Sequence, residues 1–248
     1  MSEKQDRLLL VYRSNAIYYS DAASLIRGDW IEDPIIGFYF NRLFLFQPSV
    51  IHLVANTTDI EDARTSLPPE MHDKDYLFLP TNNGNSYNSG GSHWSLLVFD
   101  RPNNVFRYYD SMSSSNLVST KLMIERICML LKIQKTSLII EKCEQQQNDL
   151  DCGIYTLLYA KTLILRLLAL SKANTPPLNL SSSPSSSRNS PRSNSSSSSF
   201  LSSSSSSGGD LDDRLWSIET LEMSARKKRK EISKIISKYS KSNRFSFF

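Results

Sequence analysis

Residues 144–155 read Glu-Gln-Gln-Gln-Asn-Asp-Leu-Asp-Cys-Gly-Ile-Tyr, and the apolar run that follows Gly153 contains no Gly or Pro before Pro176. This pattern predicts a core helix that begins at or near Cys152. Partial positive charge at a helix N-terminus favours a thiolate over a thiol. The glutamines upstream carry amide N–H groups that are suited to stabilise an oxyanion. A buried cysteine at the start of a core helix is the alternative, so a nucleophile requires a base elsewhere in the chain.

The composition is that of a folded protein without disulfides. A chain of 248 residues with 40% hydrophobic and 10% aromatic residues can form one large domain or two small ones. The three cysteines have neither paired nor CxxC spacing, which argues against a disulfide framework and a zinc site. No secretory signal pattern is present, so we expect a reducing compartment, the cytoplasm and/or the nucleus. No apolar run is as long and uncharged as a membrane span, so we expect no membrane.

The positive charge is concentrated near the C-terminus. Residues 226–241 contain eight basic residues and one acidic residue, a local charge of +7, which leaves −3 of the net +4 for the rest of the chain. The body is therefore not a basic nucleic-acid-binding surface. The basic run 226–230 is interpreted as a solvated helix face, with a nuclear-import signal as the alternative.

The element pattern predicts an α+β fold, with a small central mixed or antiparallel sheet flanked by helices. Residues 13–27 form a polar, Tyr-rich piece without an assigned element, and Asp33 is predicted to cap a helix that has Pro34 at its first position. Helices are also expected at 59–67 and 116–132, and strands at 8–12, 51–55, 76–80, 95–100, 105–110 and 138–140, the last of them buried.

The second half of the chain contains a serine-rich segment. Serine occupies 19 of the 27 positions from Ser181 to Ser207, a composition that predicts disorder. We therefore expect a domain over residues 1–172, a disordered insert over 173–210, and a C-terminal part of the same domain over 211–248. That last part is expected to contain one or two short helices within 211–239.

One of the three histidines, His93, is a candidate base, with an ordinary loop residue as the alternative. His52 lies in an apolar run, where a core role is expected, and His72 lies in an acidic loop, where solvation is expected. His93 precedes a central strand, and Asp110 follows the next strand along the chain. If these strands pair as a hairpin, both side chains reach the same sheet edge, where an aspartate can orient an imidazole. Alternatively, Asp110 only begins the turn before the next helix.

Four blocks of the sequence resemble the Ulp/sentrin-specific cysteine proteases: residues 30–38, 90–98, 109–111 and 145–155. The resemblance covers most of the chain outside the serine-rich segment. It implies that Cys152 is the nucleophile, His93 the base and Asp110 the residue that orients it. It also implies that Gln146 donates to the oxyanion.

The resemblance further implies how a substrate binds. In this family Trp94 covers a narrow tunnel that admits a Gly-Gly tail, and the block with Trp30 and Asp33 lines its approach. The first two blocks are most similar to the deneddylase branch. Glu32 and Leu150 depart from the family pattern, at positions that bear on fine specificity rather than on catalysis.

The implied function is cleavage after the C-terminal Gly-Gly of a ubiquitin-like modifier, in deconjugation of isopeptide-linked modifier and/or precursor processing. The expected partners are the neddylation modifier and conjugates such as cullins. We expect no metal, no cofactor, no nucleic acid and a monomer. A SUMO-specific protease with the same mechanism, an acetyltransferase effector of the same clan and a non-catalytic modifier-binding module are the alternatives.

Overall fold

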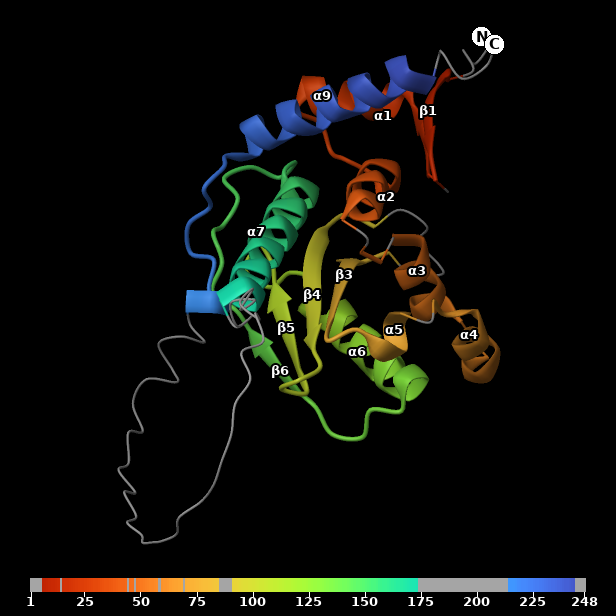
Figure 1. The fold of residues 1–248 in the computed structure, drawn as a ribbon, viewed down its shortest axis with the longest axis vertical. Coiled ribbons are helices and arrows are strands. Elements are labelled where there is room, and N and C mark those ends of the chain that lie inside the picture. Colours follow the sequence, from red (N-terminus) through yellow and green to blue (C-terminus); the bar gives the residue numbers. More distant parts are fainter. Residues whose placement is uncertain are drawn as a thin grey trace, which may run out of the picture.

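The computed structural model describes residues 6–13, 15–43, 45–46, 48–57, 59–68, 70–84, 91–173 and 214–243. Almost all of the predicted serine-rich insert lies outside these residues. A four-stranded sheet stands at the centre, in the order β3 (Tyr76–Asn82), β4 (Trp94–Asp100), β5 (Val105–Tyr109) and β6 (Ser137–Ile140). The first three strands pair antiparallel and β6 pairs parallel with β5. The predicted mixed sheet is therefore confirmed (Figure 1).

The two faces of this sheet bury separate hydrophobic clusters, because side chains alternate along each strand. One face carries Phe78, Leu96, Val98 and Tyr109, and it packs with the residues of the helix α7 (Cys152–Ala173). The other face includes Leu77, Leu97 and Phe106, and it packs with α6 (Leu117–Leu131). Figure 1 shows α7 and α6 on opposite sides of the strands. The sheet thus lies between two helical layers.

The remaining elements surround this core. A separate hairpin pairs β1 (Leu8–Tyr12) with β2 (Asn15–Tyr18). The other helices labelled in Figure 1 are α1 (Tyr19–Arg27), α2 (Asp33–Arg42), α3 (Pro48–Asn56), α4 (Ile60–Ser66), α5 (Glu70–Asp73) and α9 (Ala225–Asn243). Figure 1 shows α9 alongside α1, above α7, and α9 also contacts β1. The chain after the serine-rich segment therefore returns to the N-terminal elements.

Three predictions about secondary structure are wrong. Residues 51–55 belong to the helix α3 rather than to a strand, because Pro48 opens a helix in which Ile51 and Val54 reach the core. A short apolar run does not by itself distinguish a strand from a helix. The strand at 138–140 forms, but it lies at the sheet edge, and its Ile140 is 53% exposed. The C-terminal part forms a short helical turn at 214–216 and one helix of 19 residues, which is longer than predicted.

The structure adds two elements that the sequence did not predict and moves one predicted helix cap by one residue. The polar piece 13–27 contains β2 and α1, which ends at Gly28 in a left-handed conformation with φ +83°. Asp33 is the first residue of α2, and Glu32 is the N-cap, without a side-chain capping hydrogen bond. The capping prediction was thus displaced by one residue, a common uncertainty at helix ends.

Contrary to the expectation from the sequence, the helix α7 is long and apolar enough to cross a membrane by length and composition. Its surroundings are those of a core helix. Half of its most apolar 18-residue window is buried inside the protein. Its first turns pack against β4 and α2. Length and composition of this helix therefore carry no argument for a membrane span.

Candidate active site

The β4–β5 hairpin brings His93 and Asp110 together, as predicted. Leu96 pairs with Tyr109, so the residue just before β4 and the residue just after β5 lie at the same edge of the sheet. His93 Nε2 lies 2.6 Å from Asp110 Oδ1, and both side chains are at most 5% exposed. The aspartate therefore holds the imidazole in one orientation.

The carboxylate of Asp110 is held by four hydrogen-bond donors. Besides His93, it accepts hydrogen bonds from the Tyr108 hydroxyl and from the backbone N–H groups of Met112 and Asn116. Burial raises the pKa of Asp110, but these hydrogen bonds outweigh burial and lower it below its usual value. Asp110 is therefore ionised at neutral pH.

Asn116 braces the other side of the same pair. Its side-chain amide donates to the His93 carbonyl at 2.9 Å and to the Ser95 hydroxyl at 3.1 Å. The sequence interpretation assigned no site role to Asn116 or to Tyr108. Asn116 precedes a helix and Tyr108 lies on a core strand, positions that carry no signal of a site role. Their contact with Asp110 depends on the tertiary structure.

The ring of His93 is arranged to stay protonated beside Cys152. Burial lowers the pKa of His93, but hydrogen bonding and charge interactions with Asp110 and with the Cys152 sulfur raise it to about 9. The second ring nitrogen, Nδ1, is buried and finds no nitrogen or oxygen partner in the described part of the chain. An imidazolium in this position favours a thiolate on the neighbouring sulfur.

Cys152 begins α7, as predicted, and is 3% exposed. The next residue, Gly153, permits a close approach of the surrounding chain. A Cβ at Gly153 would lie 2.6 Å from Ile31 Cγ1 and 3.4 Å from Trp94 Cδ1. The predicted tunnel cover Trp94, which is 8% exposed, therefore packs beside the first turn that carries Cys152.

The loop before Cys152 is tied to the turn that follows β5. The Gln146 backbone N–H donates to the Ser111 carbonyl at 3.0 Å, and its side-chain oxygen accepts from the Ser111 hydroxyl at 2.6 Å. One N–H of the Gln146 side chain is bonded to the Asn148 carbonyl. Gln146 is thus anchored close to Asp110, with a second amide hydrogen not used by that bond. A cavity of about 490 Å³ adjoins this loop, lined by residues 111–113 and 145–149.

The two remaining predicted site residues lie at the surface. Trp30 is 40% exposed, and its indole N–H donates to the Asp149 carbonyl at 2.6 Å, which links it to the same loop. Asp33 is exposed at the start of α2. His72 is exposed as predicted, and His52 lies in α3, where its side chain is outside the described part.

The helix α9 contributes a residue that the sequence interpretation missed. The Arg229 guanidinium donates two hydrogen bonds to Asp151 Oδ1, at 2.8 and 2.5 Å. It also donates to the carbonyl oxygens of Ser24, Asp29 and Leu150. Arg229 therefore joins α1 and α9 to the residue that immediately precedes Cys152.

The interpretation of residues 226–230 as a solvated face is wrong for two of the five. Lys228 is fully buried and Arg229 is 5% exposed. Lys228 contacts the hydroxyl and the ring of Tyr39 and lies 3.4 Å from Glu231. The signal was present in the sequence, because Ile232 and Ile236 follow Lys228 at steps of four, which places all three on one helix face.

Comparison with known proteins gives the family. A model of the Ulp1 protease family, C-terminal catalytic domain, matches residues 46–175. The probable sentrin-specific protease 8 of Dictyostelium discoideum is 31% identical over 194 residues, which are 68% of this chain and 80% of that protein. Sentrin-specific protease 8 of Homo sapiens is 31% identical over 173 residues, which are 64% of this chain and 82% of that protein.

Two further matches extend the comparison to a second kind of relative and to a solved structure. NEDD8-specific protease 2 of Schizosaccharomyces pombe is 30% identical over 194 residues, which are 71% of this chain and 46% of that protein. The structure of the Ulp1 protease domain in complex with Smt3, the yeast ortholog of SUMO, has a TM-score of 0.56 at 18% identity. The match covers 96% of this chain and 90% of that chain. At this identity it shows that the two proteins share a fold.

A cysteine at a helix N-terminus beside a buried His–Asp pair is the arrangement of a cysteine hydrolase. The chain belongs to the Ulp1 protease family and is a cysteine protease. The predicted family resemblance and the α+β fold class are confirmed.

Proposed function

We propose that this protease is a deneddylase that cleaves after the C-terminal Gly-Gly of the neddylation modifier. The catalytic part rests on one observation above all, the buried His93–Asp110 pair beside Cys152. The choice of modifier is supported by relatives named NEDD8-specific protease and sentrin-specific protease 8, and by the sequence blocks that resemble the deneddylase branch.

The proposed reaction is acyl transfer through a thioester. The Cys152 thiolate attacks the carbonyl carbon of the terminal glycine, while the Cys152 backbone N–H and the Gln146 amide stabilise the oxyanion. As the intermediate collapses, the C–N bond breaks and His93 protonates the leaving amine. His93 then removes a proton from water, which hydrolyses the thioester and releases the modifier and the thiolate. Asp110 keeps the imidazole oriented throughout.

Trp94 and the surface around Trp30 are proposed to select the tail. Trp94 packs beside the first turn of α7, where a close cover would exclude any residue with a side chain, so that Gly-Gly is selected by exclusion. Every such modifier ends in Gly-Gly, so discrimination between modifiers must come from preceding residues.

Asp33 and Glu32 are proposed to contact the arginine that the neddylation modifier carries just before Gly-Gly. Both carboxylates are exposed, so one ion pair is worth about 1 kcal/mol at most, about fivefold in kcat/KM. Because Glu32 rather than Asp33 is the N-cap, Asp33→Asn should leave stability nearly unchanged. The preference for the arginine-bearing tail should shrink by about the same factor. An unchanged preference would remove Asp33 from the specificity determinants.

The nucleophile is tested by substitution of each cysteine. Cys152→Ala should abolish cleavage of a modifier C-terminal fluorogenic substrate and leave binding of the modifier intact. Cys128→Ala and Cys143→Ala should remain active, since these half-buried thiols have no role in the proposed reaction. Loss of activity in either control, with activity kept in Cys152→Ala, would refute the assignment.

The cellular setting is proposed on the resemblance alone. Conjugates such as cullins in the cytoplasm and/or the nucleus are the expected substrates. Cleavage of a modifier–cullin conjugate by the purified protease is the direct test, with Cys152→Ala as the inactive control.

A further inference from the structure

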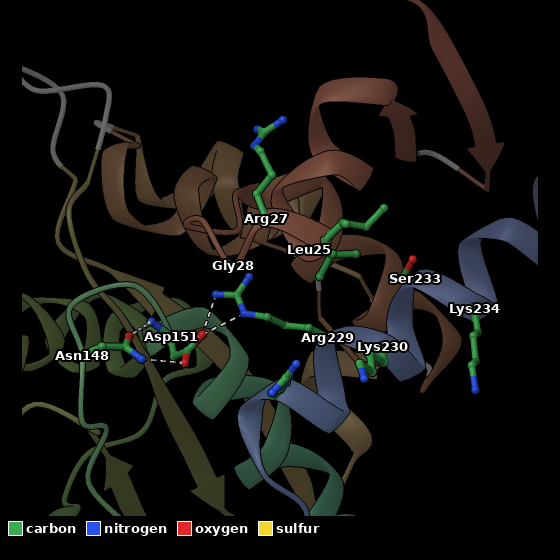
Figure 2. Close-up of a pocket in the computed structure, with 11 residues that line it drawn as sticks. Leu25, Arg27, Gly28, Asn148, Asp151, Arg229, Lys230, Ser233 and Lys234 are labelled. Carbon is green, nitrogen blue, oxygen red and sulfur yellow. Dashed lines mark hydrogen bonds and ion pairs between the residues drawn. The ribbon is translucent and has the colours of Figure 1, made fainter.

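A cavity with a positively charged lining lies between α1, α9 and the loop that precedes Cys152. Its volume is about 580 Å³. The lining includes Leu25 and Arg27 of α1, the capping residue Gly28, and Lys230, Ser233 and Lys234 of α9. Figure 2 shows Asn148 and Asp151 at one end. We call this cavity the α1–α9 groove. The His93–Asp110 pair does not line it, and it shares only Asn148 with the cavity lined by residues 111–113 and 145–149.

The carboxylate that lines the α1–α9 groove is already engaged. Asp151 is bonded to Arg229, and Asp29, next to the groove, forms an ion pair with Arg27 at 2.5 Å. Arg226, Lys230 and Lys234 line the groove and are exposed, and within the described chain no ion pair joins them to a carboxylate. The groove therefore retains unneutralised positive charge.

The spacing of these cations fits an extended chain better than a compact anion. Arg226, Lys230, Lys234 and the exposed Lys238 follow one another at steps of four residues along α9. Four residues of helix rise about 6 Å, and two residues of extended peptide span about 6.6 Å. Acidic side chains at alternate positions of an extended peptide would thus face successive cations of α9. A phosphate group would instead require the cations to converge on one point.

Two observations favour a peptide over nucleic acid. No aromatic side chain lines the groove in the described chain, so bases would have nothing on which to stack. Apart from residues 226–241, the chain carries a net charge of −3, which opposes binding of a long polyanion. The exposed Ile26, also in the lining, offers an apolar contact of the kind that a peptide side chain uses.

We propose that the α1–α9 groove binds an extended acidic segment of the protein substrate. The role as a substrate site rests on the proposed function, whereas binding of the acidic peptide does not. The groove ends at Asn148 and Asp151, so a segment bound along α9 reaches the loop that holds Cys152. This contact adds affinity for the substrate without touching the reacting atoms, so it acts on KM.

The binding test uses the full chain with Cys152→Ala and a fluorescein-labelled (Glu-Ala)₆ peptide in an anisotropy titration at low salt. Each exposed charge pair changes affinity by about two- to fivefold. The triple variant Arg226→Glu, Lys230→Glu, Lys234→Glu should therefore weaken binding by about tenfold or more. The triple variant with glutamine at the same positions should weaken it less, and raising the salt to about 0.5 M should largely abolish binding. The matched control is Lys74→Glu, Lys121→Glu, Lys135→Glu, exposed positions away from α9, and it should bind as the parent does.

The proposal is overturned if the peptide does not bind, or if the control triple variant weakens binding as much as the groove variants do. It is equally overturned if tripolyphosphate or a 12-nucleotide single-stranded DNA binds more tightly than the peptide. Both groove variants must retain the parent's circular dichroism and Tm.

The substrate role is tested with the active enzyme. The glutamine triple variant should raise KM for a modifier–protein conjugate that carries an acidic segment, by about threefold or more, with kcat unchanged. An unchanged KM, with peptide binding lost, would refute the substrate role. A wild-type enzyme that binds the peptide but cleaves no modifier substrate would refute the proposed function and leave peptide binding standing.

Discussion

Removal of the Arg229 guanidinium tests how α9 supports the nucleophile loop. Arg229→Met leaves Asp151, whose side chain is 15% exposed, without its charged partner, and it removes a donor from three carbonyl oxygens. Breaking one half of a buried ion pair costs about 3–5 kcal/mol, a large part of the 5–15 kcal/mol that a domain typically has. We therefore expect Tm to fall by about 6–20 °C, since 1 kcal/mol corresponds to about 2–4 °C at this chain length.

The measurement is a double-mutant cycle by urea denaturation, with kcat recorded for each variant. Asp151→Asn keeps an acceptor for Arg229 but loses the charge, so we expect a smaller loss of about 1–3 kcal/mol. The double variant should lose less than the sum of the two, with a coupling energy of about 1–3 kcal/mol. Arg226→Met, an exposed neighbour on the same helix, should stay within about 0.5 kcal/mol of wild type. The reasoning is refuted if Arg229→Met is as stable as Arg226→Met, or if the two losses simply add.

Three further predictions concern buried or coupled groups. Burial lowers the pKa of Lys228 from 10.5 to about 8 in spite of the nearby Glu231 carboxylate. Between these two pH values the unfolded chain binds more protons than the folded chain, so the free energy of unfolding rises with pH across that window. Lys228→Met should flatten this rise in pH-dependent denaturation and leave neutral-pH stability unchanged or higher; a loss above about 2 kcal/mol would contradict this. Glu144 accepts from the Leu221 N–H at 2.6 Å, and its own N–H donates to the Ile218 carbonyl at 2.7 Å. Glu144→Ala should lower kcat more than it raises KM, since it loosens the loop that leads to Gln146, whereas the exposed Glu219→Ala should change neither. The pKa of His93 is about 9, so kcat/KM should fall on the alkaline side with an apparent pKa near 9. Asp110→Asn should move that fall to lower pH. A wild-type fall near pH 6.5 would refute the protonated His93 between Asp110 and Cys152.

The sequence predicted the paired residues of the site because their positions follow from strand pairing. Once residues 95–100 and 105–109 are read as a hairpin, His93 and Asp110 must share an edge of the sheet. The structure places His93 Nε2 and Asp110 Oδ1 2.6 Å apart. The start of α7 at Cys152 was equally local, since the apolar run begins there. Features that depend on neighbours close in the chain are those that sequence patterns capture well.

Features that depend on distant contacts were missed or misplaced. Arg229 lies 78 positions from Asp151, and a basic run does not reveal which of its members points inward unless the apolar spacing after it is included. The apolar run at 51–55 fits a helix and a strand equally well, and packing against β3 and α6 decides for the helix α3. The strand at 138–140 is exposed because it lies at the edge of the sheet. A local sequence pattern does not predict the order of strands in a sheet.

The central claim is most directly tested by kcat/KM of the wild-type protein on a panel of modifier C-terminal fluorogenic substrates. The panel contains the neddylation modifier, SUMO and ubiquitin, each assayed beside Cys152→Ala. We expect the neddylation modifier to be cleaved with the highest kcat/KM and the Cys152→Ala variant to cleave none. Equal or faster cleavage of SUMO would contradict the deneddylase assignment, and cleavage of no modifier by a folded wild-type protein would contradict the proposed function altogether.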